Sequence, residues 1–457
     1  MKKFIFIFCL CAACSGSAPK DQLSENAILV QNVNIINVAD GSISASKHIL
    51  IDSGRIVRIS SETIAFPEDR KSIDGTGKYV MPGLAEMHAH IPPEPAGKEH
   101  INNILFLYLS NGVTTIRGML GHPYHLKLRE QAKSKDILSP RIYTSSPSLN
   151  GNTVKTLEEA KEKITNYKAD GYDFLKIHPG IKLDVFEQIV KTANEVGIPY
   201  AGHVPVDVGI RRALKNRYAS VDHIDGYLEG LVPESAGVEA NQNGFFGFNF
   251  TNLADTTMID ELVKMTQDNN VWVVPTQSLF ERWFSPDDPA IYAQADEMKY
   301  MPKSTVEKWV ASKTNLIENE NYNPEQWSKF MEIRKQLIYK LNQSKPGLIL
   351  GSDAPQVFNV PGFSIHHEMQ GMIGAGLTTL EAIQIGTINP AKYFKSEGKF
   401  GQVMEGASAD LIILNENPLL DISNLKKIEG VMVRGQWISK MEIDKKLADI
   451  AEYFSDK

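Results

Sequence analysis

Two histidines separated by one residue, His88 and His90, are the first side chains in this sequence that could bind a metal ion. They follow the apolar run at residues 81–84, which is typical of a buried strand. Side chains at positions i and i+2 of a strand point to the same side, so both imidazoles can reach one cation. Such pairs also occur by coincidence, and the pair predicts a metal site only together with further ligands.

Three further candidate ligands each stand at the end of another apolar run: His203, His223 and Asp353. Active sites of parallel α/β barrels assemble at the C-terminal ends of the strands, so these side chains are expected to meet the first histidine pair. Imidazole and carboxylate groups suit zinc, and manganese or cobalt could occupy the same set. The pattern predicts a divalent metal site.

Lys176 lies inside the apolar run Phe174-Leu175-Lys176-Ile177. Because an unpaired buried ammonium is costly, this lysine must lose its charge, pair with a carboxylate such as Asp353, or be modified. Reaction with CO₂ would turn the amine into an anionic carbamate with two oxygen ligands, able to bridge two metal ions. Together with four neutral imidazoles, that anion would balance two divalent cations.

Between residues 81 and 400, apolar runs alternate with helical stretches, the pattern of a parallel α/β fold. We predict a (β/α)8 TIM barrel, with a polar, helix-rich insertion at about 280–343. A doubly wound sheet is the alternative, but no glycine-rich phosphate turn follows the first strand. The predicted strands are 80–90, 113–117, 141–145, 173–178, 198–203, 218–223, 271–276 and 347–353.

Short alternating runs separated by Asp-Gly and Ser-Gly turns fill residues 27–80, and the same texture returns at residues 401–445. Neither part holds enough apolar residues for a core of its own. We therefore predict that the two ends of the chain combine into one small β-sandwich domain beside the barrel.

The chain resembles the amidohydrolase superfamily, close to the imidazolonepropionase-related amidohydrolases and the Xaa-Pro dipeptidases (prolidases) with a carbamylated lysine. The resemblance covers residues 28–440, with its motifs in the right order. The matching motifs are Met81-Pro82-Gly83-Leu84, His88-Ala89-His90, Gly112-Val113-Thr114-Thr115, Asp173-Phe174-Leu175-Lys176-Ile177, Gly202-His203, Val221-Asp222-His223, Gly351-Ser352-Asp353-Ala354-Pro355, His366-His367-Glu368 and Gly406-Ala407-Ser408-Ala409-Asp410-Leu411.

The resemblance implies two metal ions, most simply zinc, that share a carbamate on Lys176. It assigns His88, His90 and Asp353 to one ion, and His203 and His223 to the other. A hydroxide between the ions would attack an amide carbonyl. Asp353 would accept the water proton and pass it to the leaving nitrogen.

The sequence departs from the family pattern where substrate should lie. Gly118 stands where relatives usually have Asp, and residues 147–152 lack the Gly-His-rich loop of many relatives. These changes bear on specificity rather than on the metal chemistry.

Three other side chains are candidate substrate contacts. Tyr227 could donate a hydrogen bond to the carbonyl oxygen in the transition state, unless it is an ordinary loop tyrosine. Arg117 could bind a substrate carboxylate through two hydrogen bonds, unless it forms a structural ion pair. His366 could line the pocket or orient Glu368.

The N-terminus is predicted to be a targeting segment. Two lysines precede ten apolar residues, too few to span a bilayer but right for a secretory signal. Residues 10–16 resemble a bacterial lipoprotein signal, which predicts a signal peptide at 1–18 with Cys14 lipidated and a linker at 19–26. Cleavage near Ala18 without lipidation is the alternative. We expect an exported protein, periplasmic or anchored to the outer membrane by its lipid.

Composition excludes several classes of function. The 457 residues carry 48 Lys and Arg against 55 Asp and Glu, a net charge of −7, and no basic block. Such a chain is a poor candidate for binding nucleic acid. All three cysteines lie within residues 9–14, so cysteine nucleophiles and cysteine-bound zinc are excluded from the mature domain.

We therefore predict an exported binuclear metal-dependent amidohydrolase that cleaves a C–N amide bond. Dipeptides of the Xaa-Pro kind or N-acyl amino acids are the expected small-molecule substrates, and a homo-oligomer is left open. The alternatives are a cyclic-amide hydrolase acting like imidazolonepropionase, an esterase or lactonase, and a non-catalytic ligand-binding lipoprotein. Lys176 argues against the first, and against deaminases, because those chemistries generally use one metal and no carbamate.

Overall fold

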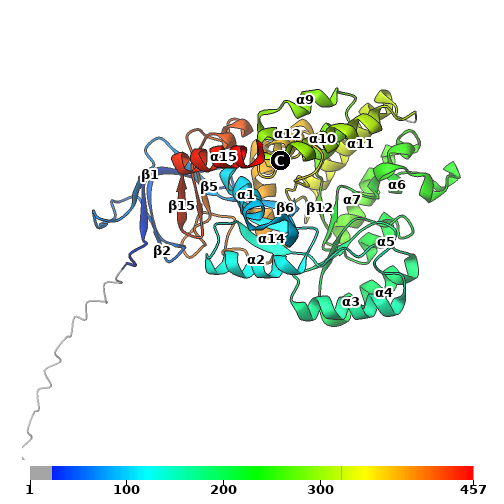
Figure 1. The fold of residues 1–457 in the computed structure, drawn as a ribbon, viewed down its shortest axis with the longest axis horizontal. Helices are drawn as coiled ribbons and strands as arrows, with labels where there is room; N and C mark the ends of the chain where they lie inside the picture. The colour runs from blue at the N-terminus through cyan, green and yellow to red at the C-terminus, as the bar shows by residue number, and fades with distance from the viewer. Residues whose placement is uncertain (1–22, 321, 456) are drawn as a thin grey trace, which may run out of the picture.

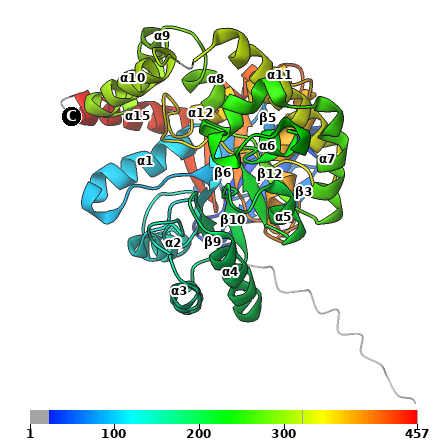
Figure 2. The ribbon, with the colours of Figure 1, turned by 90° about the vertical axis from the view of Figure 1, so that its right-hand side faces the viewer.

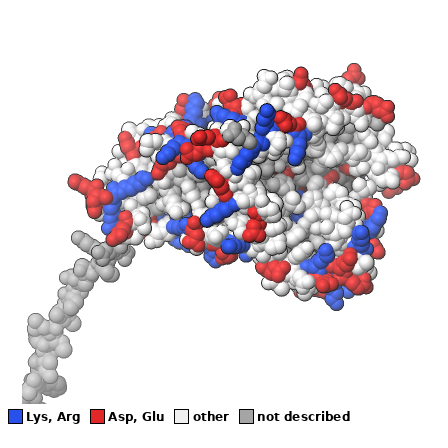
Figure 3. All heavy atoms as spheres, viewed as in Figure 1, with Lys and Arg blue, Asp and Glu red and all other residues white. Residues whose placement is uncertain are grey.

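The computed structural model describes residues 23–320, 322–455 and 457; the predicted signal peptide and Cys14 lie outside them. A mixed sheet forms one end of the molecule, and helices surround parallel strands at the other (Figure 1). On the face drawn in Figure 3, positive and negative side chains intermingle. No helix in the described part of the chain is both long and apolar enough to cross a membrane.

Strands from both ends of the chain form one mixed sheet. Its order is β15-β14-β13-β5-β1-β2-β3, and β4 pairs with β1. The β2–β3 hairpin turns at Ser53 and Gly54, both with positive φ, the backbone that tight hairpins require. Strands from the two ends of the chain thus lie in the same sheet. Because the described strands form one hydrogen-bonded sheet, the β-sandwich domain stays a prediction. The strands are β1 Ile28–Ile36, β2 Ile43–Asp52, β3 Arg55–Ser60, β4 Ser72–Asp74, β5 Tyr79–Pro82, β13 Leu411–Leu414, β14 Ile428–Val433 and β15 Gln436–Ser439.

The middle of the chain contains two parallel sheets, in the orders β6-β7-β8 and β12-β11-β10-β9. Figure 2 shows β6, β9, β10 and β12 at the centre, with helices around them. The parallel α/β class is therefore confirmed. The strands are β6 Leu84–Ala89, β7 Val113–Gly118, β8 Arg141–Thr144, β9 Leu175–Ile177, β10 Tyr200–Gly202, β11 Ser220–Asp222 and β12 Trp272–Val274.

Single bridges connect the two parallel sheets. A parallel bridge between Ser145 and Phe174 links the end of β8 to the start of β9. On the other side, Val273 of β12 bridges Leu348. The amide of Met87 in β6 then donates to the carbonyl of Leu350 at 2.7 Å. The eighth predicted strand at 347–353 thus lies between β12 and β6, held by isolated bridges rather than as a regular strand.

Some helices begin and end at capping residues. Helix α3 begins after Thr156, whose side chain forms a capping box with Glu159, and ends at Gly171 in the left-handed conformation. The α-helices are α1 Lys98–Ser110, α2 Pro123–Ser134, α3 Leu157–Asp170, α4 Leu183–Val196, α5 Ile210–Lys215, α6 Tyr227–Gly230, α7 Ile259–Asp268, α8 Gln277–Trp283, α9 Pro289–Ala293, α10 Lys303–Ile317, α11 Pro324–Gln343, α12 Ser364–Gly374, α13 Thr379–Gly386, α14 Ile388–Tyr393 and α15 Lys440–Ser455. The 3-10 helices are η1 Glu94–Ala96, η2 Glu234–Ala236, η3 Ala240–Gln242, η4 Phe245–Leu253, η5 Thr256–Met258, η6 Asp296–Tyr300 and η7 Ile422–Lys426.

Helix α11 connects the region predicted as an insertion to the strand ends. Its Arg334 is buried, and the guanidinium donates to the carbonyls of His223 at 2.8 Å and Pro275 at 2.7 Å. The same guanidinium stacks on Phe280, 3.6 Å from the ring centre. Arg334 therefore fixes the backbone next to a predicted metal ligand.

Candidate metal centre

The chain bends sharply where the predicted ligands follow their strands. His223 has φ of 66° and Asp353 has φ of 65°, both in the left-handed region that side chains other than glycine rarely adopt. Such outliers cost energy and persist where the surrounding structure holds them. In a regular strand, the side chain of His223 would point to the face opposite that of Asp222. The bend at His223 changes this direction.

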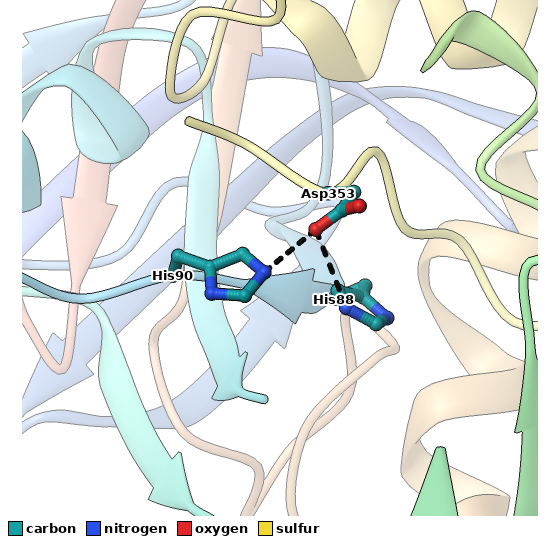
Figure 4. Close-up of side chains that lie close together, drawn as sticks. All are labelled: His88, His90 and Asp353. Carbon is teal, nitrogen blue, oxygen red and sulfur yellow. Dashed lines mark hydrogen bonds and ion pairs between the residues drawn. The ribbon is translucent and has the colours of Figure 1, made fainter. Parts of the chain in front are cut away.

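His88, His90 and Asp353 form a compact group of potential ligands (Figure 4). Their ligand atoms all lie within 4.8 Å of one another. Asp353 Oδ1 is 2.6 Å from Nε2 of His90 and 3.4 Å from Nε2 of His88. Two imidazole nitrogens therefore converge on one carboxylate oxygen, as the His-x-His pattern predicted.

The other two predicted histidines lie beside this group. The ring centre of His223 is 4.5 Å from that of His88 and 4.6 Å from that of His203. Asp353 Oδ2 lies 3.9 Å from Nδ1 of His223. The structure thus brings all four predicted histidines and the aspartate to one place.

Three of the histidines have an oxygen partner close to Nδ1. Asp222 Oδ2 lies 3.0 Å from Nδ1 of His88 and Asp225 Oδ2 lies 3.0 Å from Nδ1 of His203. Thr276 Oγ1 lies 2.9 Å from Nδ1 of His223. The contacts of His203 and His223 are hydrogen bonds, which fix the ring and leave Nε2 to bind a cation, the usual arrangement around metal-binding histidines. The contact of Asp222 with His88 has the distance of an ion pair but not the geometry of a hydrogen bond.

Lys176 lies on β9 and is completely buried. Its Nζ has no hydrogen-bond partner, and the nearest carboxylate oxygen in an ion pair is Asp222 Oδ2, at 3.8 Å. Burial lowers the pKa of Lys176 to about 8, against the opposing effect of Asp222. The amine therefore has one long ion pair and no hydrogen bond, and it loses its proton more easily than an exposed lysine.

Arg117 is also fully buried, below the predicted ligands rather than among them. Its guanidinium donates to Asp222 Oδ1 at 3.1 Å, to Ser220 Oγ at 2.9 Å and to the hydroxyl of Tyr393 at 2.7 Å. Its Nε donates to the carbonyl of Met87 at 2.6 Å. In this position Arg117 supports Asp222, the partner of His88, instead of reaching the cavity as a substrate contact.

A cavity of about 500 Å³ opens above the histidines. Its lining combines imidazoles and carboxylates with apolar and aromatic side chains. Its lining is His88, His90, His178, Pro179, His203, Val204, Val206, His223, Asp225, Asn243, Gly244, Phe245, Phe246, Leu279, Trp283, Asp353 and Gln356.

The family follows from comparison with known sequences. Residues 79–438 match the model of the amidohydrolase family. The chain belongs to the amidohydrolase family. This confirms the resemblance found in the motifs, and membership makes the chain a hydrolase.

Relatives within the amidohydrolase family differ in their reactions. An adenine deaminase from Clostridium perfringens is 25% identical over 272 residues, 54% of this chain and 43% of the deaminase. The chain spans about half the length of the curated adenine deaminases that it matches. Among solved structures, bottromycin amidohydrolase is 19% identical with a TM-score of 0.71, covering 94% of this chain and 91% of that one. A Xaa-Pro dipeptidase with bound methionine is 19% identical with a TM-score of 0.63, covering 90% and 100%. These likenesses show the fold.

The donor set of this amidohydrolase fits divalent ions. Histidine nitrogens and a carboxylate suit zinc, manganese or cobalt. The buried Nζ of Lys176, which makes no hydrogen bond, fits a group that becomes an anionic ligand. The residues that would hold the metal are therefore present, and the rings of His203 and His223 are held by hydrogen bonds from Nδ1.

Two predicted substrate contacts lie away from the cavity lining. The hydroxyl of Tyr227 hydrogen-bonds Thr266 of α7 at 2.7 Å, because α6 turns this side chain into the core. His366 is buried on α12, where Nε2 lies 3.2 Å from Asn111 Oδ1, and Glu368 accepts from the amides that begin α8. As with Arg117, the predicted substrate role does not match the placement.

Sequence reasoning missed the residues that support the ligands, chiefly Asp222, Asp225 and Thr276. The signal was present for two of them, because the carboxylates of Asp-His-Ile-Asp flank His223 at residues 222–225. Missed too was Phe246, whose ring lies 5.3 Å from that of His223. Nothing in its local sequence indicates that it reaches the site.

Acid should destabilise the metal-free protein. Burial holds the pKa of His88 and His223 well below the usual value, so both stay neutral when folded and take up a proton on unfolding. Their contribution is complete above an unfolded pKa of about 6.5 and is lost as pH falls. Urea unfolding with chelator present should show the free energy of unfolding falling below that pH, by up to ~1.4 kcal/mol per pH unit for each histidine. The slope should shrink in His223→Asn, and a flat profile from pH 6.5 to 5 would contradict this assignment.

Proposed function

We propose that this amidohydrolase is an exported, metal-dependent enzyme that hydrolyses a C–N amide bond at a binuclear centre. Dipeptides or N-acyl amino acids are the proposed substrates. The observation that carries the proposal is Lys176, a buried amine without a hydrogen bond, close enough to His88 that its charge, after burial, lowers the pKa of that ring. That placement suits an anionic bridging ligand better than a structural ion pair.

Carbamylation of Lys176 needs only the unprotonated amine and CO₂. The unprotonated amine attacks CO₂, a C–N bond forms at Nζ, and one proton is released. Burial favours this step because it lowers the pKa of the amine to about 8. Bicarbonate and metal supplied together should therefore promote assembly.

Bound divalent ions would supply Lewis acidity and a nucleophilic water at neutral pH. His88, His90 and Asp353 would hold one ion, His203 and His223 the other, with Lys176 between them. The two oxygens of Asp353 face different histidines. Oδ1 lies next to the pair His88 and His90, and Oδ2 lies 3.9 Å from His223. We assign to Oδ2 the proton taken from water and delivered to the leaving nitrogen.

The remaining architecture belongs to the same proposal. The parallel strands and residues 347–353 would form one closed (β/α)8 barrel, which the bridges at Ser145 and Leu348 support. The mixed sheet would be the composite β-sandwich. The exported enzyme would lie in the periplasm or be anchored to the outer membrane by a lipid on Cys14.

Deamination of an amino-substituted heterocycle is a second candidate, favoured by the adenine deaminases among the relatives. One assay separates the two. Zinc-loaded protein is incubated with Xaa-Pro dipeptides, N-acyl amino acids and adenine, and free amine and ammonia are measured. We expect amine from the amides, none after chelation, and no ammonia from adenine. Ammonia from adenine, with the amides intact, would overturn the proposed function.

A further inference from the structure

The lining of the cavity above the metal centre combines two chemically different groups of side chains. Histidines and carboxylates form one group, and Phe245, Phe246, Leu279 and Trp283 form the other. We call these four side chains the aromatic wall. A substrate seated over the histidines lies next to this wall, because both groups line one cavity of about 500 Å³ and the Phe246 ring is 5.3 Å from that of His223.

The aromatic wall is a packed surface built by two elements, η4 and α8. Phe245 packs between Trp283 and Phe284, with ring centres 5.0 and 5.3 Å away. Phe246 meets Phe280 edge to face at 5.0 Å. Rings at such distances stabilise one another, so the wall is rigid enough to select among ligands.

Phe246 is held over the predicted ligands by an unusual backbone. Its φ of 53° is left-handed, a genuine outlier for a bulky side chain. Next to it, a Cβ at Gly247 would lie 2.8 Å from Glu229 Oε2, so the chain passes close to that carboxyl. Glu229 also accepts a hydrogen bond at 2.7 Å from Asn243, which lines the cavity. The surrounding contacts thus maintain a strained turn that aims one ring at the site.

That ring lies close to where an amide would react. The centre of Phe246 is 5.8 Å from that of His203 and 5.3 Å from that of His223. Beside it, 45% of Phe245 is exposed, although Phe284, on which its ring stacks, is buried. A bound apolar group would cover this surface and gain the free energy of removing it from water.

We propose that the aromatic wall binds an aromatic or large apolar group carried next to the scissile amide. This deepens the proposed function and rests on it for the position of that amide. Amides with a benzyl-sized group are then the preferred substrate class, and amides with small groups are poor ligands.

Binding to metal-free protein tests this preference without hydrolysis. The probes are N-acetylphenylalanine amide and N-acetylglycine amide, which differ by one benzyl group, titrated by NMR. We expect the phenylalanine derivative to bind at least about tenfold more tightly. Phe246→Ala should reduce the ratio to below about threefold, Phe246→Leu should retain part of it, and Leu253→Ala should leave it unchanged. Leu253 is a matched control because it lies on η4 with 40% exposure but outside the cavity lining.

Equal affinities for the two probes, or a preference that survives in folded Phe246→Ala protein, would overturn the inference. Circular dichroism of each variant establishes that it is folded. The proposed function fails separately, if zinc-loaded wild type binds the phenylalanine derivative with this preference but releases amine from none of the amides.

Discussion

Replacing Lys176 with alanine should strip the protein of most of its bound metal. Wild type loaded with zinc and bicarbonate should hold about two ions per chain, and the variant fewer than about one. The reason is that one carbamate would be a ligand to both ions, so its loss weakens both sites. Loss of an outer partner of a ligand costs about 10–100-fold in affinity or activity, and loss of a shared ligand should cost more. Elemental analysis and amine release measure the two effects.

Lys313 offers a matched control for this substitution. It too is completely buried, and burial lowers its pKa to about 8. Its Nζ, however, is satisfied, donating to the carbonyl of Ser285 at 2.6 Å and to Ser285 Oγ at 2.9 Å. Lys313→Ala should lower stability and leave the metal content unchanged. About one ion per chain in both wild type and Lys176→Ala would rule out the binuclear centre and favour deamination or cyclic-amide hydrolysis.

The candidate site could be predicted because its residues end strands. In a parallel α/β fold, every strand delivers its last side chains to one edge, so His203, His223 and Asp353 could be grouped without knowing any distance. Lys176 was conspicuous for a different reason. A charge inside an apolar run demands an explanation wherever the run is placed.

How deep a side chain lies in the fold could not be predicted in the same way. Arg117 and Tyr227 stand at sequence positions that suit substrate contacts. In the structure, however, Arg117 donates to buried Asp222, and the hydroxyl of Tyr227 hydrogen-bonds Thr266. A sequence shows which face of a strand a side chain takes, but not how far along the axis its polar end lies. Tertiary neighbours decide that, and for Arg117 they are Ser220 and Tyr393, far apart in the chain.

Phe246 illustrates a second limit. Its position depends on the close approach of Gly247 to Glu229 and on a left-handed backbone, which no local propensity favours for a phenylalanine. The fold class could be predicted from alternating apolar runs, whereas residues 243–253, which include η4, have no periodic hydrophobic pattern. Specificity therefore lies in the segment that sequence patterns describe least.

Asp353→Asn should separate proton transfer from metal binding. Asparagine keeps an oxygen where Oδ1 meets His90, so most of the metal should remain bound, but it cannot accept the water proton. We expect kcat to fall by about 10²–10⁴-fold, the usual contribution of a positioned acid or base, with a smaller change in KM. The loss should be smaller for p-nitroanilides than for alkyl amides, because p-nitroaniline departs with less need of a proton. Equal losses for both leaving groups, with metal retained, would show that Asp353 does not protonate the leaving nitrogen. A kcat within about threefold of wild type would show that Asp353 takes no part in proton transfer.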